Sequence, residues 1–569
     1  MYPALRLAAA LVCVPSVAHA QSIKRQPEVP DMPPAPAGSA RTLRIPAVSE
    51  PWFQRAGFPR SVQVNVSEEH LDILSDAANE PSIAVDPTAP NRIVIGWRQF
   101  DTVASNFRQA GFSYSRDGGR SWSPVNRLTP GLFRSDPVLE ADADGNFYYY
   151  SLPSTGDPPG GWRCEVFKST NGGTSWSSPV PAGGGDRAWF TIDKSGGIGD
   201  GNIYGIWNPA FTCCPGANAA RDSSHGLLPW PPAFATPIQT IWGTNAVGPD
   251  GELYIAGRLG SNFGIVRSDD ARNSMASPSF PLSRNFSLGG PIVLGVVSNP
   301  GGAPGQTWVD VNRTAGPNRG HVYALALIDP PSGDTTQVVF IRSTDRGLTW
   351  STPVVVNDDN SLSAVQWFPS MSVAPTGRID VTFNDTRNTS DPNRSQLFYT
   401  FSLDEGATWS PNVPVGPPWN STFGWPQQDK IGDYYDQESD LVGVSIAYAA
   451  TYTGGQDVYF LRLGQYDCNS NALGDTDEIN ADASLDCNDN GILDTCEIAA
   501  GTRPDTNHNR RLDSCELCPA DWNADLLLNS QDFFAFLADF FTSAADFNGS
   551  GSTTSQDFFD YLAAFFNGC

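Results

Sequence analysis

"SRDGGRSW" (Ser115–Trp122) decides the fold, because the octet recurs along the chain. It returns as "STNGGTSW" (169–176), "STDRGLTW" (343–350) and "SLDEGATW" (402–409), and a degenerate copy, "SDDARNSM", occupies 268–275. The shared pattern is Ser-x-Asp/Asn-x-Gly-x-x-Trp. Each copy follows a short alternating apolar run, which is typical of a β-strand, and Asp, Gly and Ser are turn residues. We therefore interpret the octet as a structural turn that marks a repeat.

A second motif, a strand, a turn and another strand, occurs seven times between residues 61 and 465. A repeat of roughly 50 to 65 residues holds four short strands, which is one blade of a β-propeller. The last repeat has three clear strands and no octet, so we expect "SVQVNV" at 61–66 to supply its fourth strand and close the ring. The predicted fold is all-β, a seven-bladed propeller, with six blades as the alternative.

The octet is identified as the Asp box of the sialidase (BNR-repeat) superfamily, and the resemblance covers about 400 residues of repeats. Most members of that superfamily have six blades, so the fifth repeat could be the additional one. The resemblance implies a sialidase-like propeller with its substrate face opposite the Asp boxes.

The N-terminal 60 residues indicate export. Residues 1–20 combine Arg6, an apolar run and an Ala18-His19-Ala20 cleavage site, which together predict a signal peptide. Residues 21–60 are a proline-rich spacer, and no later stretch is apolar enough to span a membrane. We expect a secreted or cell-surface protein in which most of the nine cysteines that follow the signal peptide form disulfides and one could stay free.

The net charge is −26, and residues 467–569 contribute 19 acidic and 3 basic side chains to it, a net of −16. Such a tail repels nucleic acids and anionic membranes. It suits either a solvated acidic tail or a segment that binds cations, and the spacing of the acidic residues decides between them.

Residues 467–516 contain three acidic repeats with a 19-residue period, "DCNSNALGDTDE", "DCNDNGILDTCE" and "DTNHNRRLDSCE". Each places oxygen side chains at positions 1, 3, 5, 9 and 12, as Ca²⁺ requires. Glycine occupies position 6 only at Gly491, so the loops with Ala472 and Arg510 should bind more weakly. Cys468 and Cys487 occupy equivalent positions in the first two copies, and Cys496 and Cys515 do so in the last two. Pairing between neighbouring copies could link this segment, although the sequence leaves the connectivity open. The predicted ligands are Asp467, Asn469, Asn471, Asp475, Glu478, Asp486, Asn488, Asn490, Asp494, Glu497, Asp505, Asn507, Asn509, Asp513 and Glu516.

Residues 518–569 contain two further loops, each followed by an amphipathic helix rich in phenylalanine. This pair resembles a dockerin, which implies Ca²⁺ in both loops and docking to a cohesin-like or cell-surface partner. The phenylalanines could pack the helices together or form an exposed docking face. Cys518 and Cys569 could clasp the ends of the module. The predicted ligands are Asp521, Asn523, Asp525, Asn529, Asp532, Asp546, Asn548, Ser550 and Asp557.

The sialidase resemblance also implies catalytic residues in the propeller. Arg258 and Arg394 match arginines that grip the substrate carboxylate, Asp101 matches the acid/base, and Tyr434 or Tyr435 matches the nucleophile. Two expected parts are not matched. Glu80 stands where the first arginine belongs, and "WGTN" at 242–245 lacks the glutamate that would activate the tyrosine.

Two classes of function remain. A glycoside hydrolase could use two of five carboxylates expected on one face, Glu80, Asp101, Asp136, Asp385 and Asp433. A non-catalytic propeller would bind an extracellular glycan or peptide in a funnel lined by Trp97, Arg98, Trp207, Arg258, Trp367 and Asp385. The sequence favours a secreted, calcium-binding protein of the second class, with the hydrolase as the alternative.

Overall fold

The structure is a computed structural model, and it describes residues 52–53, 58–153, 162–505, 510, 512–515, 518, 520–523, 527–548 and 550–567. The predicted signal peptide and nearly all of the spacer lie outside the described residues. So do Cys569 and, among the predicted calcium ligands, Asn507, Asn509, the side chain of Asp513, Glu516 and Asp525.

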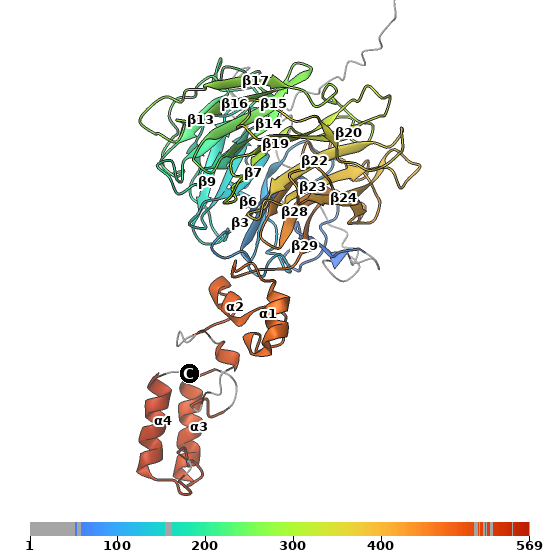
Figure 1. The fold of residues 1–569 in the computed structure, drawn as a ribbon. Coiled ribbons are helices and arrows are strands. Elements are labelled where there is room, and N and C mark those ends of the chain that lie inside the picture. The colour runs from blue at the N-terminus through green and yellow to red at the C-terminus, as the bar shows by residue number, and fades with distance from the viewer. Residues whose placement is uncertain are drawn as a thin grey trace, which may run out of the picture.

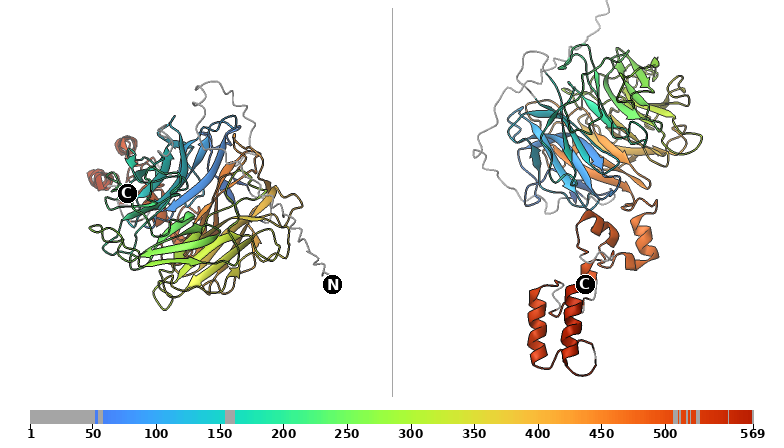
Figure 2. Two further views of the ribbon diagram at one scale, coloured as in Figure 1. Left: turned by 90° about the horizontal axis from the view of Figure 1, so that it is seen from above. Right: turned by 90° about the vertical axis from the view of Figure 1, so that its left-hand side faces the viewer.

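Seven antiparallel sheets surround one axis, so the predicted seven-bladed propeller is confirmed (Figure 1; Figure 2, left). Each of the first six blades is built from strands that are consecutive in sequence, with the first strand nearest the axis. The first three blades contain β3 (Ala77–Val85), β4 (Ile93–Phe100), β5 (Gln109–Ser115) and β6 (Asn126–Leu128); β7 (Arg134–Ala141), β8 (Phe147–Pro153), β9 (Glu165–Ser169) and β10 (Val180–Pro181); and β11 (Trp189–Ile192), β12 (Ile203–Ile206) and β13 (Ala219–Asp222).

The next three blades follow the same plan, and a short strand, β26 (Trp419–Asn420), pairs beside the last of them. They contain β14 (Ile241–Val247), β15 (Leu253–Leu259), β16 (Asn262–Ser268) and β17 (Leu282–Phe286); β18 (Trp308–Val311), β19 (Val322–Ile328), β20 (Gln337–Ser343) and β21 (Val354–Val355); and β22 (Gln366–Val373), β23 (Ile379–Asp385), β24 (Arg394–Ser402) and β25 (Val413–Pro414).

The seventh blade closes the ring with both ends of the propeller sequence. It contains β27 (Asp436–Ser439), β28 (Gly443–Ala450) and β29 (Asp457–Gly464), and then β2 (Ser61–Gln63) and β1 (Trp52–Phe53). Val62 of β2 is the antiparallel partner of Phe460 in β29. The strand expected at 61–66 therefore closes the ring, although its regular part is only three residues long.

Each intact Asp box is a hydrogen-bonded turn. In the first copy, Ser115 Oγ donates to Asp117 Oδ1 at 2.8 Å and accepts the Gly119 N–H at 2.8 Å. Asp117 Oδ1 also accepts the Ser121 N–H at 2.9 Å. Gly119 has φ +85°, which explains the glycine in the motif.

The tryptophan of each intact Asp box also joins its blade to the one before it. Trp122 of the first blade packs against Phe460 of the seventh, with ring centroids 5.4 Å apart. The same contact recurs at the intact boxes of the second, fifth and sixth blades, in the pairs Trp176–Phe112 (5.7 Å), Trp350–Phe286 (5.0 Å) and Trp409–Phe340 (5.3 Å). The motif therefore fixes the contact between neighbouring blades as well as its own turn.

A small helical arm follows the propeller (Figure 1; Figure 2, right). It contains α1 (Asp475–Ala481), α2 (Asp494–Ala500) and the 3-10 turns η1 (Ala483–Leu485) and η2 (Asp513–Cys515), and leads to the pair α3 (Ser530–Phe541) and α4 (Ser555–Asn567). The arm leaves from the side of the first Asp box, where Arg120 stacks on Tyr466 at 3.9 Å. No helix in the described residues combines the length and apolar character that a bilayer crossing requires.

Disulfides connect the arm as expected, between neighbouring repeats. Cys468 pairs with Cys496, and Cys487 pairs with Cys515, both across 28 residues. In the propeller, Cys213 pairs with its neighbour Cys214, which leaves Cys164 as a buried free thiol. Cys518 is disulfide-bonded, and the partner expected for it, Cys569, lies outside the described residues.

The inter-blade contact of the Asp box predicts a difference between two equivalent glycines. Gly119 and Gly347 both occupy the fifth position of their boxes, with φ of +85° and +90°. A methyl group on Gly119 would overlap the Phe460 ring, whereas one on Gly347 would lie 3.1 Å from the flexible end of Leu282. We expect Gly347→Ala to lower the free energy of unfolding by about 1–2 kcal/mol through its backbone conformation alone. Gly119→Ala should lower it by about 1–3 kcal/mol more.

Chemical denaturation of the two variants measures this difference. Because both share the same backbone cost, Gly347→Ala is the control for Gly119→Ala. Equal destabilisation of the two variants would show that the box does not hold the preceding blade.

Candidate functional site

The inner strands of several blades begin with an irregular backbone segment, and the residues at this position include charged side chains near the propeller axis. At the start of β3, β7, β14 and β22 the pairing register shifts, as in a β-bulge. The residue at this position has a positive φ in five blades although none is glycine, and such residues often mark functional sites. They are Glu80 (52°), Asp136 (49°), Arg187 (50°), Trp242 (55°) and Phe368 (52°).

The charged members of this set meet two further cations and one further carboxylate. Glu80 Oε2 lies 3.1 Å from Arg98 Nε and Glu80 Oε1 lies 3.7 Å from Lys430 Nζ. Asp433 Oδ2 lies 3.0 Å from both Lys430 Nζ and an Arg187 amino nitrogen. We call the six charged residues the axial cluster: Glu80, Arg98, Asp136, Arg187, Lys430 and Asp433.

The axial cluster spans the centre of the propeller. Arg187 precedes β11 of the third blade and Asp433 precedes β27 of the seventh, so their ion pair joins blades that are not neighbours. Asp136 of the second blade accepts the Arg187 N–H at 2.8 Å. The cluster lies at the starts of the inner strands, which is the end of the propeller away from the Asp boxes.

Burial governs the electrostatics of the cluster. Glu80 and Arg98 are 1% and 0% exposed, and burial raises the pKa of Glu80 to about 8, although the Arg98 charge partly opposes the shift. Asp433 is different, because its contacts with Arg187 and Lys430 outweigh burial and hold its pKa well below the usual range. The pKa values of these two carboxyl groups are therefore shifted in opposite directions, as in many acid/base pairs.

The structure brings together four residues that the sequence singled out. Glu80, Arg98, Asp136 and Asp433 are members of the axial cluster. Tyr434 lies beside it, with its hydroxyl donating to the Pro137 carbonyl at 2.7 Å. Burial raises the pKa of Tyr434 well above its ordinary value.

Other residues predicted to be catalytic lie elsewhere. Asp101 is exposed, accepts from Gln109 at 2.7 Å and pairs with Arg127 at 2.5 Å. Arg258 stacks on Trp242 at 5.0 Å and donates to the Gly260 carbonyl. Arg394 is exposed at the start of β24, and Tyr435 is a core residue that packs on Phe368.

The residues predicted to bind a ligand through aromatic rings lie in the core. Trp97, Trp207 and Trp367 are 0–2% exposed and belong to hydrophobic core clusters of the propeller. Asp385 is also buried and forms an ion pair with Arg387 at 2.8 Å. The structure therefore places these four side chains away from any surface that a sugar could reach.

Two members of the axial cluster were not predicted from the sequence. Arg187 occupies in the third repeat the position that Glu80 and Asp136 occupy in the first two, so an alignment of the seven repeats would have found it. Lys430 lies in the loop before the last repeat and matches no repeated position. Only its contacts with Glu80 and Asp433 identify it.

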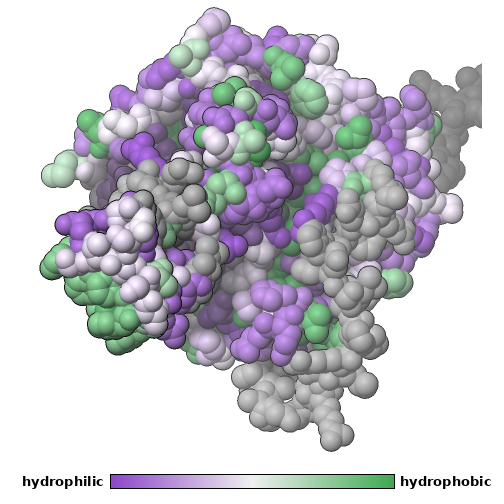
Figure 3. Space-filling model, turned by 90° about the horizontal axis from the view of Figure 1, so that it is seen from below, coloured by the Kyte–Doolittle hydropathy of each residue, from purple (hydrophilic) through white to green (hydrophobic). Residues whose placement is uncertain are grey.

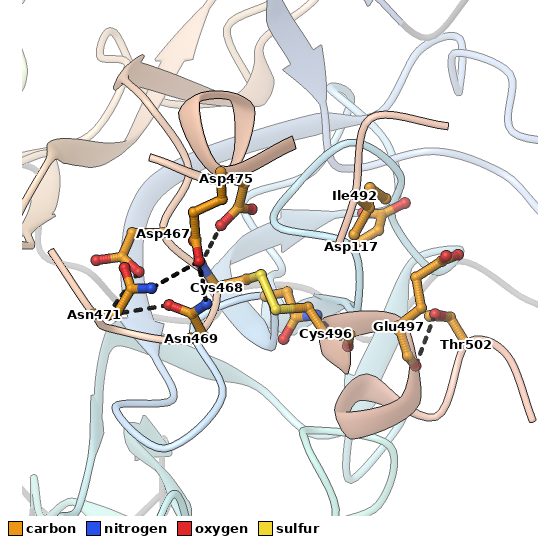
Figure 4. The surroundings of a disulfide bond; sticks show 12 residues. Asp117, Asp467, Cys468, Asn469, Asn471, Asp475, Ile492, Cys496, Glu497 and Thr502 are labelled. Atoms are coloured by element: carbon orange, nitrogen blue, oxygen red, sulfur yellow. Dashed lines mark hydrogen bonds between the residues drawn. A yellow bond between two sulfur atoms is a disulfide. The ribbon is translucent and has the colours of Figure 1, made fainter. Parts of the chain in front are cut away.

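The first two acidic repeats form loops of the same design, and Figure 4 shows Asp467, Asn469, Asn471 and Asp475 of the first loop beside the Cys468–Cys496 disulfide. In the first, the two carboxylate oxygens of Asp467 accept the backbone N–H groups of Asn471 and Ala472 at 3.0 and 2.9 Å. The amides of Asn469 and Asn471 both reach the Glu478 carboxylate, at 3.2 and 2.8 Å. Positions 1, 3, 5 and 12 are therefore gathered around one loop.

The second repeat reproduces this arrangement. Asn488 and Asn490 reach Glu497 at 2.8 and 2.9 Å, and Asp486 accepts the N–H groups of Asn490 and Gly491. Glu497 is 4% exposed, and a buried carboxylate is costly without a counter-charge. Arg503 Nε lies 3.7 Å from it.

The donor set fits a Ca²⁺ ion. Asp475 Oδ2 at position 9 of the first loop is buried and accepts no hydrogen bond from a described residue. Carboxylate and amide oxygens from five positions of a twelve-residue loop are the ligands that Ca²⁺ prefers. The ion would supply the positive charge that these gathered oxygens need.

Position 6 has a left-handed backbone in the four loops in which the structure describes it. Its φ is +77° at Gly491 and +89° at Gly551, but also +69° at Ala472 and +71° at Arg510. A residue with a side chain pays about 1–2 kcal/mol for this conformation. The expected weakness of the loops without glycine thus has a conformational cause.

The last two loops share a further feature. Asp532 and Asp557, at position 12, are fully buried and accept the N–H groups of Asn523 and Asn548 at position 3, at 3.3 and 3.1 Å. Asp546 accepts the Ser550 N–H at 2.8 Å. In the third repeat, Asp505 accepts the Arg510 N–H at 2.9 Å.

Comparisons with known proteins return similar solved structures at low sequence identity. A protein of unknown function from Dyadobacter fermentans is 15% identical, with a TM-score of 0.39 over 71% of this chain and 97% of its own. The Hadza microbial sialidase Hz136 is 15% identical, with a TM-score of 0.36 over 68% of this chain and 66% of its own. NanB sialidase from Streptococcus pneumoniae is 11% identical, with a TM-score of 0.35 over 73% and 71%. No family model and no curated protein matches the chain.

The raised pKa of Glu80 predicts a pH dependence of stability. The unfolded chain releases this proton near pH 4.5, whereas the folded protein retains it up to about pH 8. The contribution of Glu80 to the free energy of unfolding is therefore fully present below pH 4.5 and is lost as the pH rises to about 8. The loss amounts to at most about 1.4 kcal/mol per pH unit. Glu80→Gln should remove this decline.

Denaturation curves between pH 5 and 8 test the prediction, with Asp101→Asn, an exposed carboxylate at the same end, as the control. The free energy of unfolding of Glu80→Gln should rise relative to that of the wild type as the pH increases. Parallel curves for the two proteins would contradict the assigned shift.

Proposed function

We propose that this chain is a secreted calcium-binding protein whose propeller binds an extracellular glycan without cleaving it and whose C-terminal module attaches the protein to a partner. The convergence of oxygen side chains in the loops at 467–478 and 486–497 carries the calcium part of this proposal. In each loop an Asp, two Asn residues and a Glu from fixed positions are gathered, in the order in which Ca²⁺ uses them.

The axial cluster supports binding over catalysis. Each of its cations lies within 4 Å of a carboxylate of the cluster, so a substrate carboxylate would have to displace an acidic side chain. The Tyr434 hydroxyl is tied to a backbone carbonyl, and its raised pKa makes it a poor nucleophile.

The disulfides support secretion. The arm has few buried apolar side chains, and Cys468–Cys496 and Cys487–Cys515 link its repeats. Small domains of this kind depend on disulfides and metal ions, and such bonds persist in oxidising compartments.

The helical pair supports attachment to a cohesin-like or cell-surface partner. Its core is the stacked pair Phe536 and Tyr561, with ring centroids 3.8 Å apart. Apolar side chains gather on the outside of the projecting pair (Figure 3). The exposed phenylalanines repeat with the 25-residue period of the module and are Phe534 (64%), Phe541 (79%), Phe559 (61%) and Phe566 (79%).

A glycoside hydrolase is the second candidate, and the opposed pKa shifts of Glu80 and Asp433 favour it. In that case Glu80 would donate the proton and Asp433 would remain ionised. A panel of fluorogenic glycosides that includes a sialoside separates the candidates. We expect the wild-type protein to hydrolyse these glycosides no faster than a Glu80→Gln/Asp433→Asn double variant does. We also expect the wild-type protein to bind to a glycan array. Turnover that the double variant abolishes would favour the hydrolase.

Loss of the position-12 carboxylate tests the calcium loops. Glu497→Gln should lower the Ca²⁺ affinity of the second loop at least about tenfold, because it removes a charged ligand oxygen worth more than about 1.4 kcal/mol. Asp489→Asn is the control, since this exposed side chain occupies position 4 of the same loop. Calorimetric titration of the full chain measures both variants. Equal Ca²⁺ affinities of the Glu497→Gln and Asp489→Asn variants would exclude Glu497 as a ligand.

A gain of affinity is predicted at the first loop. Ala472→Gly removes the cost of a φ of +69° at position 6. If the loop adopts this conformation only when Ca²⁺ is bound, the affinity should rise about 5- to 30-fold. The same titration provides the measurement, and an unchanged affinity would show that the loop already holds this conformation without the ion.

A further inference from the structure

The arm lies against the junction between the first and seventh blades, which we call the seam. Tyr466, the last residue before the first acidic loop, lies between two arginines. Its ring centroid is 3.9 Å from the guanidinium carbon of Arg120 in the first blade and 5.6 Å from that of Arg462 in the seventh. A methyl group on Gly118 would lie 2.8 Å from the Tyr466 ring, so the glycine leaves room for it. Tyr466 therefore contacts both sides of the seam.

The second acidic loop and α2 contact the first blade through backbone carbonyls. Asn91 Nδ2 donates to the Cys496 carbonyl at 2.9 Å, and an Arg120 amino group reaches the Gly491 carbonyl at 3.5 Å. Asn91 is 3% exposed, so its hydrogen bond to α2 is shielded from water. Arg120 thus contacts the second loop as well as the ring of Tyr466.

Little space separates the arm from the propeller. The gap that remains at the seam has a volume of 20 Å³, which holds about one water molecule. Its walls include Gly118 of the first blade, Ser445 of the seventh blade, and Asp467 and Ile492 of the acidic loops. Figure 4 shows Ile492 beside Asp117 of the first Asp box. Both loops are therefore in direct contact with the propeller.

The residues that contact the seam belong to segments that a bound ion would order. The Asp475 N–H, at position 9 of the first loop, donates to the Tyr466 carbonyl at 2.7 Å, and Asp475 Oδ1 accepts the Cys468 N–H at 2.9 Å. Gly491 is at position 6 of the second loop, and Cys496 is next to position 12. The disulfide between Cys468 and Cys496 connects the two loops. A rearrangement of either loop would therefore move residues that contact the seam.

The charges of the loops oppose this arrangement unless a cation binds. The two loops, 467–478 and 486–497, each have four acidic side chains and no basic one. Asp475 of the first loop and Glu497 of the second are 1% and 4% exposed, and burial strengthens the repulsion among the charges of each loop. A bound Ca²⁺ ion would offset this repulsion. The docked arm should therefore depend on Ca²⁺.

We propose that binding of Ca²⁺ to the first two acidic loops stabilises the propeller ring at the seam. The ordered loops hold Tyr466 against both blades at the one junction of the ring that is not continuous in sequence. A ligand that binds only the folded and docked state stabilises that state, so Ca²⁺ stabilises the propeller as well as the arm. This inference rests on the calcium part of the proposed function and adds regulation of the propeller by the same ion.

Thermal unfolding of the full chain tests the proposal, because tryptophan fluorescence reports on the propeller. Of the 16 tryptophans, only Trp522 follows residue 465. We expect saturating Ca²⁺ to raise the melting temperature of the fluorescence transition by at least about 2 °C above its value in EDTA. Mg²⁺ at the same concentration should raise it less. A Glu478→Gln/Glu497→Gln double variant should lose most of the Ca²⁺-dependent shift.

Variants at the interface locate the effect. Arg120→Met and Tyr466→Leu should each remove about half or more of the Ca²⁺-dependent shift, because each removes the contact between the arginine and the aromatic ring. Arg116→Met is the matched control, since Arg116 belongs to the same Asp box but donates to Thr174 of the second blade at 2.7 Å. The melting curve of each variant in EDTA shows that it is folded.

Calorimetric titration with Ca²⁺ distinguishes failure of this proposal from failure of the proposed function. A chain that binds Ca²⁺ without a shift in the fluorescence transition overturns the stabilisation of the seam and leaves the proposed calcium binding intact. The same holds if the shift is equal in Arg120→Met, Tyr466→Leu and Arg116→Met, or if it survives the Glu478→Gln/Glu497→Gln double variant. A chain that binds no Ca²⁺ overturns both.

Discussion

The packing of each Asp-box tryptophan on an aromatic ring of the preceding blade is the contact on which the propeller depends. Trp122 on Phe460 is its most consequential case, because it joins the first blade to the last. The three-residue strand β2 closes the same junction through backbone pairing. Side chains at the rim and backbone bonds in the sheet thus secure the one place where the ring is not continuous in sequence.

The Asp-box contacts hold the blades together at the rim of the propeller, whereas the backbone near its axis is irregular. The inner strands begin with residues in left-handed conformations, and the six charged groups of the axial cluster meet there. Because buried ion pairs seldom add net stability, we interpret the axial cluster as serving function or conformational specificity.

The seven-bladed fold could be predicted because its signals are local and repeated, as in the five octets and the seven strand pairs. The gathering of oxygen side chains in the first two acidic repeats could be predicted for the same reason, since these positions follow from spacing along one segment. The axial cluster could not be predicted as a whole, because it depends on contacts between residues of different repeats. Trp97 and Trp367 were expected at a surface but are buried between blades, and Lys430 is recognisable only through its contacts. Glu80 and Arg98 were both singled out in the sequence, but only the structure shows that they form an ion pair.

The number of calcium ions bound per chain is the most direct test of the account, because five loops were assigned from their spacing and two of them have their side chains gathered in the same way. Native mass spectrometry of the purified protein, with increasing Ca²⁺ and with Mg²⁺ as the competing ion, counts them. The account predicts at least two ions bound before the others and up to five at saturation. A chain that binds fewer than two, or that binds Mg²⁺ equally well, would contradict it.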